Sequence, residues 1–126
     1  MRPYFLLLFS IVFGLLSCNK DDEFPSCVKA NVIGPEQCSD FILVEIISPG
    51  GVGKDITYYD GKSYHNVIKL ISNDGVQNIN SGYYNVRDFD PERDSALSDP
   101  VICQAIYAPY NVPAMVANAF SIMECP

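Results

Sequence analysis

Short β-rich segments separated by turn residues limit most strongly what this chain of 126 residues can fold into. Residues 41–48, FILVEIIS, form an almost unbroken β-branched and apolar run, which predicts a strand in the middle of a sheet. Residues 56–60 and 63–72 flank Gly61 and Lys62, and this arrangement predicts a β-hairpin.

The second half of the chain continues this pattern. Residues 82–89 alternate between apolar and polar side chains, and residues 101–108 form another apolar run, so each predicts a strand. Between them, residues 90–100 predict an acidic loop with one helical turn. Residues 113–125 fit both a helix and a strand. We favour a strand, because a cysteine close behind it suits a sheet that is stapled by a disulfide.

Five or six short strands in one small domain predict an all-β fold. Our first expectation is a small antiparallel barrel of five strands that is OB-like, and the alternative is an immunoglobulin-like sandwich. The spacing of the strands leaves room for one domain, which we place at residues 27–126.

The first 17 residues have the composition of a cleaved leader. Arg2 supplies one positive charge, and residues 5–16 form an apolar run of 12 residues. A helix needs about 18 to 20 apolar residues to cross a bilayer, so this run is too short to be a membrane span. Its length and its basic flank are typical of a signal peptide.

The leader ends in Leu15-Leu16-Ser17-Cys18, which resembles the lipobox of bacterial lipoproteins. The resemblance implies cleavage before Cys18 and acylation of that residue. One acyl chain gives only marginal membrane binding, whereas two or three chains on one residue make release very slow. The alternative is an ordinary secretory signal with a coincidental cysteine.

Residues 18–26 predict a lipidated acidic tether. Asn19 and Lys20 are followed by three acidic residues at 21–23, and this pattern resembles the surface-exported lipoproteins of Gram-negative bacteria. The resemblance implies an outer-membrane location with the domain facing outward. A domain that faces the periplasm is the alternative.

The other cysteines are even in number, which predicts two disulfides in a small exported domain. They are Cys27, Cys38, Cys103 and Cys125. The pairing is not fixed by the sequence. We favour Cys27–Cys38 with Cys103–Cys125, and the main alternative joins the two ends of the domain as Cys27–Cys125.

Charge and residue types argue against several functions. Without the leader, seven basic residues face 15 acidic ones, a net charge of −8, which repels nucleic acid. His65 is the only histidine, so the chain lacks the histidines and free thiolates typical of zinc sites and nucleophilic pairs. We therefore expect no catalytic residues, no cofactor and no enzymatic activity.

The acidic segment 88–99 is a weak candidate for calcium binding. Asp88, Asp90, Glu92 and Asp99 fall at ligand positions of an EF-hand-like loop. However, Arg93 stands where that loop needs a glycine for its sharp turn. A solvated, turn-forming loop is the favoured interpretation.

The tyrosines of the domain suggest a binding surface, because rigid aromatic side chains provide good contacts for proteins and sugars. We place this candidate surface at Tyr107, Tyr110 and Met115. The expected function is a small non-catalytic binding module in the cell envelope, with a protein or glycan partner. The alternatives are a purely structural envelope component and a calcium-stabilised glycan-binding accessory protein.

Overall fold

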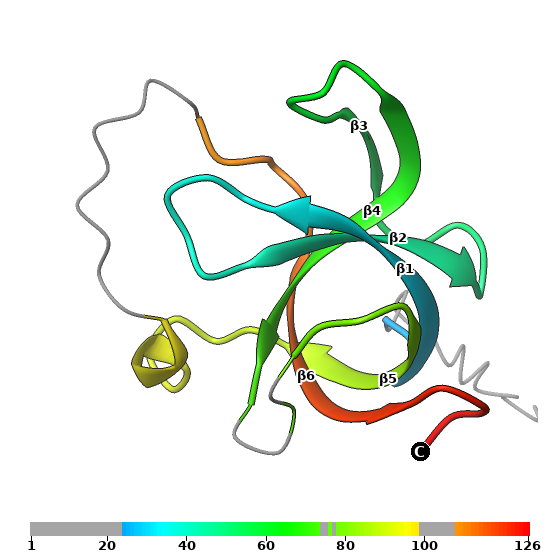
Figure 1. The fold of residues 1–126 in the computed structure, drawn as a ribbon. Helices are drawn as coiled ribbons and strands as arrows, with labels where there is room; N and C mark the ends of the chain where they lie inside the picture. Colours follow the sequence, from blue (N-terminus) through cyan, green and yellow to red (C-terminus); the bar gives the residue numbers. More distant parts are fainter. Residues whose placement is uncertain (1–23, 74–75, 77, 99–107) are drawn as a thin grey trace, which may run out of the picture.

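The computed structural model describes residues 24–73, 76, 78–98 and 108–126. In this part of the chain, six strands form one sheet that curls into a barrel (Figure 1). The strands are β1 (Cys27–Pro35), β2 (Ile42–Ser48), β3 (Lys54–Thr57), β4 (Ser63–Ser72), β5 (Gly82–Asp88) and β6 (Ala114–Ser121). A short 3₁₀ helix, η1, spans Ser95–Leu97. The described residues include no helix that is long and apolar enough to cross a membrane.

Five of the strands close the barrel in the order β1-β2-β4-β6-β5, because β5 pairs back with β1 and β2 pairs with β4. The remaining strand, β3, pairs only with β4 and projects from the barrel as half of a hairpin (Figure 1). The all-β prediction is confirmed, and the barrel is the form that the protein adopts rather than the sandwich.

One strand pairing departs from the antiparallel expectation. Five of the six pairings are antiparallel, whereas β4 and β6 run parallel, with Lys69 opposite Ala114. This parallel pair arises because β6 enters the barrel between β4 and β5, after a long connection from the end of β5. Parallel neighbours need such a crossover connection.

The sequence analysis predicted no strand at β1, because Gly34 and Pro35 are residues typical of turns. The strand instead continues to Pro35, with a register shift between Val32 and Gly34. Its first half carries a clear alternation, since Val28 and Ala30 are buried while Lys29 is exposed. The strand therefore lines the core with one face.

The other predicted elements can be compared directly with the structure. The strands at 41–48 and 82–89 and the hairpin around Gly61 and Lys62 are confirmed, as β2, β5 and β3–β4. The helical turn in the acidic loop is η1, and residues 113–125 contain the strand β6 rather than a helix. The strand expected at 101–108 lies almost entirely outside the described residues.

The core of the barrel centres on Tyr84, whose side chain is fully buried and packs against Phe120 with ring centroids 4.9 Å apart. Its hydroxyl accepts a hydrogen bond from the Asn80 amide at 2.7 Å and donates one to the Asn80 carbonyl. This hydroxyl fixes the connection between β4 and β5 against the core. A Cβ on Gly82 would lie 2.5 Å from Phe120, so glycine is required for this packing.

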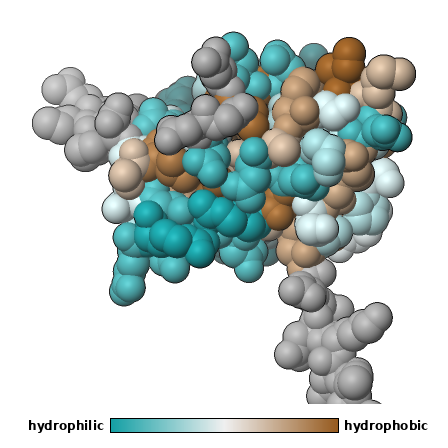
Figure 2. Space-filling model, turned by 90° about the horizontal axis from the view of Figure 1, so that it is seen from below, coloured by the Kyte–Doolittle hydropathy of each residue, from teal (hydrophilic) through white to brown (hydrophobic). Residues whose placement is uncertain are grey.

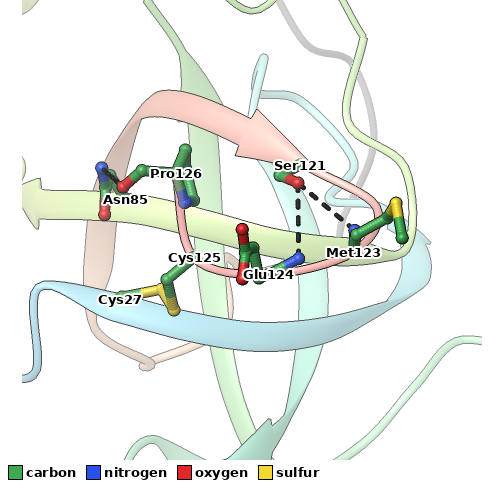
Figure 3. Close-up of a disulfide and its surroundings, with 7 residues drawn as sticks. All are labelled: Cys27, Asn85, Ser121, Met123, Glu124, Cys125 and Pro126. Carbon is green, nitrogen blue, oxygen red and sulfur yellow. Dashed lines mark hydrogen bonds between the residues drawn. A yellow bond between two sulfur atoms is a disulfide. The ribbon is translucent and has the colours of Figure 1, made fainter.

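A disulfide joins Cys27 at the start of β1 to Cys125 behind β6, with a Cα–Cα distance of 6.1 Å (Figure 3). The favoured pairing of Cys27 with Cys38 is therefore wrong, and so is that of Cys103 with Cys125. The reason is β1 itself, because nine residues of strand extend over up to roughly 25 Å, far beyond the span of a disulfide. Cys38 is also disulfide-bonded. Cys18 and Cys103 lie outside the described residues.

Candidate functional site

Four tyrosines gather where the β3–β4 hairpin meets the segment that leads into β6. We call Tyr58, Tyr59, Tyr64 and Tyr110 the tyrosine cluster. The Tyr59 ring lies 4.8 Å from Tyr58 and 5.2 Å from Tyr110, measured between centroids. The rings of Tyr58 and Tyr110 are stacked at 6.3 Å, and Tyr64 meets Tyr58 edge-on at 6.4 Å. All four side chains are partly exposed.

Three hydroxyls of the tyrosine cluster are held by backbone groups. Tyr58 donates to the Pro35 carbonyl at 2.8 Å, and Tyr110 donates to the Thr57 carbonyl at 3.0 Å. Tyr59 accepts a hydrogen bond from the Gln37 amide at 3.0 Å. These bonds tie together the end of β1, the end of β3 and the segment before β6, so the rings have little freedom to rotate.

The close approach of Tyr58 to β1 depends on a glycine. A Cβ on Gly34 would lie 2.5 Å from the Tyr58 hydroxyl oxygen, which leaves no room for a side chain. Beneath the rings, Leu43, Val67 and Val112 form a small buried cluster of their own. The rings therefore cover a packed apolar floor rather than an open cavity.

The cluster presents uncharged rings to solvent. Burial raises the pKa of both the Tyr58 and Tyr110 hydroxyls above the usual tyrosine value, and the neighbouring tyrosines add to the shift. Both groups thus stay neutral across the physiological range of pH.

A buried ion pair supports the tyrosine cluster from below. The side chain of Glu36 is 1% exposed, and it lies 3.3 Å from the ammonium group of Lys69. The same carboxylate accepts hydrogen bonds from the Tyr110 amide at 3.0 Å and from the Ser39 hydroxyl at 2.9 Å. Lys69 also donates to the Tyr110 carbonyl and lies over the Phe41 ring. The pair thus connects the β1–β2 loop with the backbone of Tyr110.

The three residues predicted to form the binding surface do not lie together on the surface. Tyr110 belongs to the tyrosine cluster, whereas Tyr107 lies outside the described residues. Met115 is 2% exposed and belongs to the core, so its assignment to the surface is wrong. Met115 lies opposite Leu70 on β4 and belongs to the core cluster that contains Tyr84 and Val86.

The assembly of the cluster was missed at the sequence level, although its members were visible as tyrosines. The β3–β4 hairpin supplies Tyr58, Tyr59 and Tyr64. Tyr110 lies 46 residues after Tyr64, in the segment that leads into β6. The parallel pairing of β4 with β6, together with the hydrogen bonds of Tyr110 to Glu36 and Thr57, brings them together. The consecutive pair of Tyr83 and Tyr84 separates as a strand requires, with Tyr84 in the core and Tyr83 beneath the Lys29 ammonium group.

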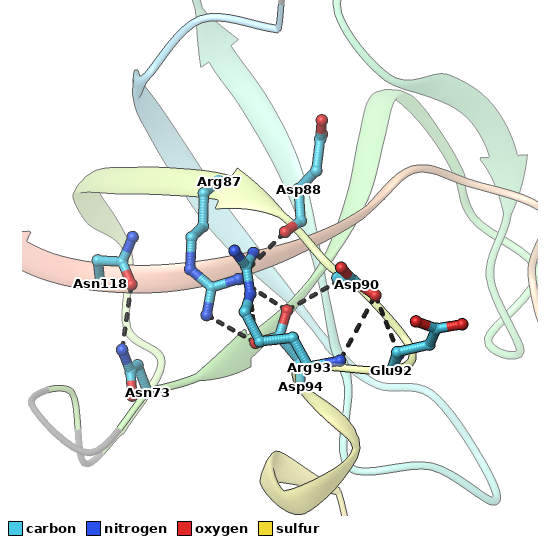
Figure 4. A network of polar contacts seen from close by, with 8 residues as sticks. All are labelled: Asn73, Arg87, Asp88, Asp90, Glu92, Arg93, Asp94 and Asn118. Atoms are coloured by element: carbon cyan, nitrogen blue, oxygen red, sulfur yellow. Dashed lines mark hydrogen bonds and ion pairs between the residues drawn. The ribbon is translucent and has the colours of Figure 1, made fainter.

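The acidic loop after β5 is organised around the carboxylate of Asp94 (Figure 4). The carboxylate of Asp94 is 3% exposed and forms two hydrogen bonds with the Arg87 guanidinium, at 2.7 and 2.8 Å. It also accepts a hydrogen bond from the Asp90 amide, and the Asp90 carboxylate in turn accepts from the Glu92 amide. The loop is therefore held by side chain-to-backbone hydrogen bonds.

Of the calcium candidates, Asp88, Asp90 and Glu92 are exposed, and Asp99 lies outside the described residues. Within the described part of the chain, no three acidic, histidine or cysteine side chains are arranged to hold a metal ion. The Arg87 guanidinium beside Asp94 holds the pKa of that carboxyl well below its usual range. Asp94 thus acts as a structural anchor of the loop.

His65 lies on the outer surface of β4. Its Nδ1 atom is 3.1 Å from Asp55 on β3, and both side chains are more than 70% exposed. The hydrogen bond from His65 lowers the pKa of the Asp55 carboxyl. This surface pair links the two strands of the hairpin.

Comparison with protein-family models, with curated proteins and with solved structures found no match for this chain.

Proposed function

We propose that this chain is an envelope lipoprotein whose barrel is a non-catalytic binding module. In this proposal, acyl chains on Cys18 fix the protein to the bacterial outer membrane, with the domain facing outward. The tyrosine cluster is its binding surface, and its partner is a glycan or a protein of the envelope. The anchoring part is supported by the short apolar leader and by the lipobox-like residues before Cys18.

The count of cysteines gives the anchoring further support. Cys27 and Cys125 are bonded to each other, and Cys38 is disulfide-bonded as well. Of the five cysteines, only Cys18 and Cys103 remain, so one of them pairs with Cys38 and the other has no cysteine partner within the chain. Cys103 is the partner expected for Cys38, and Cys18 then remains for lipid.

The observation that carries the binding part is the rigid arrangement of the tyrosine cluster. OB-like barrels bind oligosaccharides and oligonucleotides with one face of the barrel and the loops around it. Here the rings stand where the β1–β2 loop, the hairpin and the segment before β6 meet. The net charge disfavours nucleic acid, whereas neutral aromatic faces suit sugar rings. Pre-ordered tyrosines bind at a low entropic cost.

A purely structural role is the second candidate, and the hydroxyl bonds favour it. Three tyrosines act as clamps between loops, which is sufficient reason for their presence. The two roles make different predictions for ligand binding.

The anchor is tested by replacing Cys18→Ala in the full chain and fractionating the cells. We expect the wild-type protein in the membrane pellet and the variant in the soluble fraction. A variant that still pellets with membranes contradicts the anchoring proposal.

The binding surface is tested with Tyr59→Ala, because this ring lies against the rings of both Tyr58 and Tyr110. Tyr83→Ala is the matched control, a partly exposed tyrosine on β5 outside the cluster. We expect an array of purified envelope glycans to retain the wild type and the control, and to lose Tyr59→Ala. Folding of each variant is checked by circular dichroism. If the array retains none of the folded proteins, or if both variants lose binding equally, the cluster is not a glycan site.

A further inference from the structure

A pocket of about 220 Å³ lies where the segment before β1 meets the end of β5 and the start of β6. Among the described residues, its lining consists of Phe24, Ser26, Val86, Arg87, Asp88 and Met115. None of these belongs to the tyrosine cluster, so the pocket is a separate site. Hydrophobic and hydrophilic residues are mixed on the surface that Figure 2 shows from below, and the pocket combines both kinds in one hollow. Ligand sites typically have this form, with apolar walls and a few polar groups that fix the ligand.

The walls of the pocket are largely apolar, but they include one carboxylate without a protein partner. Val86 and Met115 are buried core residues, and Phe24 packs against the same core. Asp88 is exposed at the end of β5, and its carboxylate makes no ion pair or hydrogen bond within the part of the chain that the structure describes. Figure 4 shows this side chain directed away from Asp94. The charge of Asp88 is therefore available to a ligand.

The positive charge in the lining is already compensated. The Arg87 guanidinium makes two hydrogen bonds with the buried Asp94 carboxylate and a third with the Asp88 carbonyl. Residues 87–94 contain two arginines and four carboxylates, a local net charge of −2, and residues 21–23, directly before Phe24, are all acidic. This surplus of negative charge attracts a cation and repels an anion.

The size and the walls of the pocket limit which cation suits it. Pockets for drug-sized ligands have about 300 to 1,000 Å³, whereas this one has room for about seven water molecules. A bare ion leaves the apolar walls unused. An aliphatic chain that ends in an ammonium group uses both features, because its carbons cover apolar surface while its charge meets a carboxylate. The aromatic ring of Phe24 adds to the attraction for an ammonium group.

We propose that this pocket binds an alkylammonium group, such as the end of a lysine side chain. The aliphatic carbons lie against Phe24, Val86 and Met115, and the ammonium group pairs with Asp88. This inference depends neither on the tyrosine cluster nor on the lipid anchor. It gives the barrel a second recognition site, which is specific for a cation.

The methionines of the chain allow a direct test. After the leader, Met115 and Met123 are the only methionines. Met115 lines the pocket, whereas Met123 is 82% exposed and lies outside the lining, so it is an internal control. The probe is n-butylammonium chloride, which is titrated into the full lipidated chain in a neutral detergent while the labelled methionine methyl groups are followed by NMR. The matched probes are n-butanol, which is neutral, and n-butyrate, which is negative.

We expect n-butylammonium to shift the Met115 signal in a saturable manner and to leave Met123 unchanged, with at least about three-fold weaker binding of the other two probes. We expect Asp88→Asn to weaken the binding of n-butylammonium about three-fold. Glu92→Gln makes the same charge change at an exposed position outside the lining, and it is expected to retain the binding. Circular dichroism checks that both variants are folded.

Three results overturn the inference. They are the absence of a saturable shift at Met115, equal binding of n-butanol, and equal weakening by Asp88→Asn and Glu92→Gln. If Asp88→Asn does not fold, the comparison of the three probes on the wild type decides. A second arm uses Nα-acetyl-lysine methylamide. If it binds as tightly as n-butylammonium, the ligand is supported as a lysine side chain of a protein, whereas binding of n-butylammonium alone supports a free amine.

Discussion

Removal of the disulfide between Cys27 and Cys125 is expected to cost as much stability as truncation of a large side chain in the core. The bond closes a loop of 98 residues, for which the chain-entropy estimate is about 4.7 kcal/mol. A second disulfide inside this loop lowers the figure, because the closed path becomes shorter. If Cys38 pairs with Cys103, the path runs through the 11 residues from Cys27 to Cys38 and the 22 from Cys103 to Cys125. The estimate then falls to about 3.7 kcal/mol.

The perturbation is the double variant Cys27→Ala/Cys125→Ala, which leaves the other cysteines in place. For a domain of about 100 residues, a loss of about 3.7 kcal/mol corresponds to a fall in Tm of roughly 15 to 30 °C. The assay is equilibrium unfolding in urea, followed by circular dichroism, with the wild type as reference. Both residues lie in exposed or half-exposed positions, so little packing is lost with the sulfurs.

Two results refute this reasoning. A loss below about 1 kcal/mol shows that the bond does not restrain the unfolded chain as the loop length requires. Peptide mapping of the wild type gives the second check, because it must recover Cys38 joined to Cys103. A free Cys103 removes the nested loop and also removes the support that the cysteine count gives to lipidation of Cys18.

Three other changes test the supports of the barrel. Lys69→Met leaves the Glu36 carboxylate buried without its ion partner, so we expect a loss of about 3 kcal/mol in urea unfolding, and a smaller loss when Glu36→Gln is added. The pKa of Asp94 is lower in the folded state than the usual value of about 3.9. Its pairing with Arg87 therefore stabilises the fold above about pH 4, and this stabilisation is lost as the pH falls below that value. The stability difference between wild type and Asp94→Asn must therefore shrink in titrations from about pH 6 to about pH 3, and a constant difference contradicts the assignment. Tyr84→Phe leaves two backbone groups of the β4–β5 connection without their hydroxyl partner, and we expect unfolding experiments to show a loss of about 1 to 3 kcal/mol.

Local sequence patterns predicted the strands that have strong local signals. The run at 41–48 has no polar break except Glu45, and the Gly61 turn closes a hairpin between neighbours in sequence. Strand β1 was missed because Gly34 normally interrupts a strand. Its glycine is instead needed for the approach of Tyr58, a residue 24 positions away. No local pattern contains that requirement.

The candidate site was harder to predict than the fold, because it depends on contacts between distant segments. Tyr110 reaches the tyrosine cluster only through the parallel pairing of β4 with β6 and through the Glu36 carboxylate, which binds its amide. Met115 was assigned to the surface because a proline-rich segment precedes it. Its burial follows from the place of β6 between β4 and β5, where Met115, Val116 and Ala117 are all buried. The choice between barrel and sandwich likewise depended on the pairing of β2 with β4.

The position of β6 between β4 and β5 has a consequence for the order of events after synthesis. A nascent chain that lacks Ala114–Ser121 has two open sheet edges and cannot close the barrel, however long it waits. Closure must therefore await delivery of the final strand, which pairs with both β4 and β5 across long stretches of sequence, and such non-local contacts form slowly. A chain of this design stays open during synthesis, and it becomes a closed barrel only once its last strand is available.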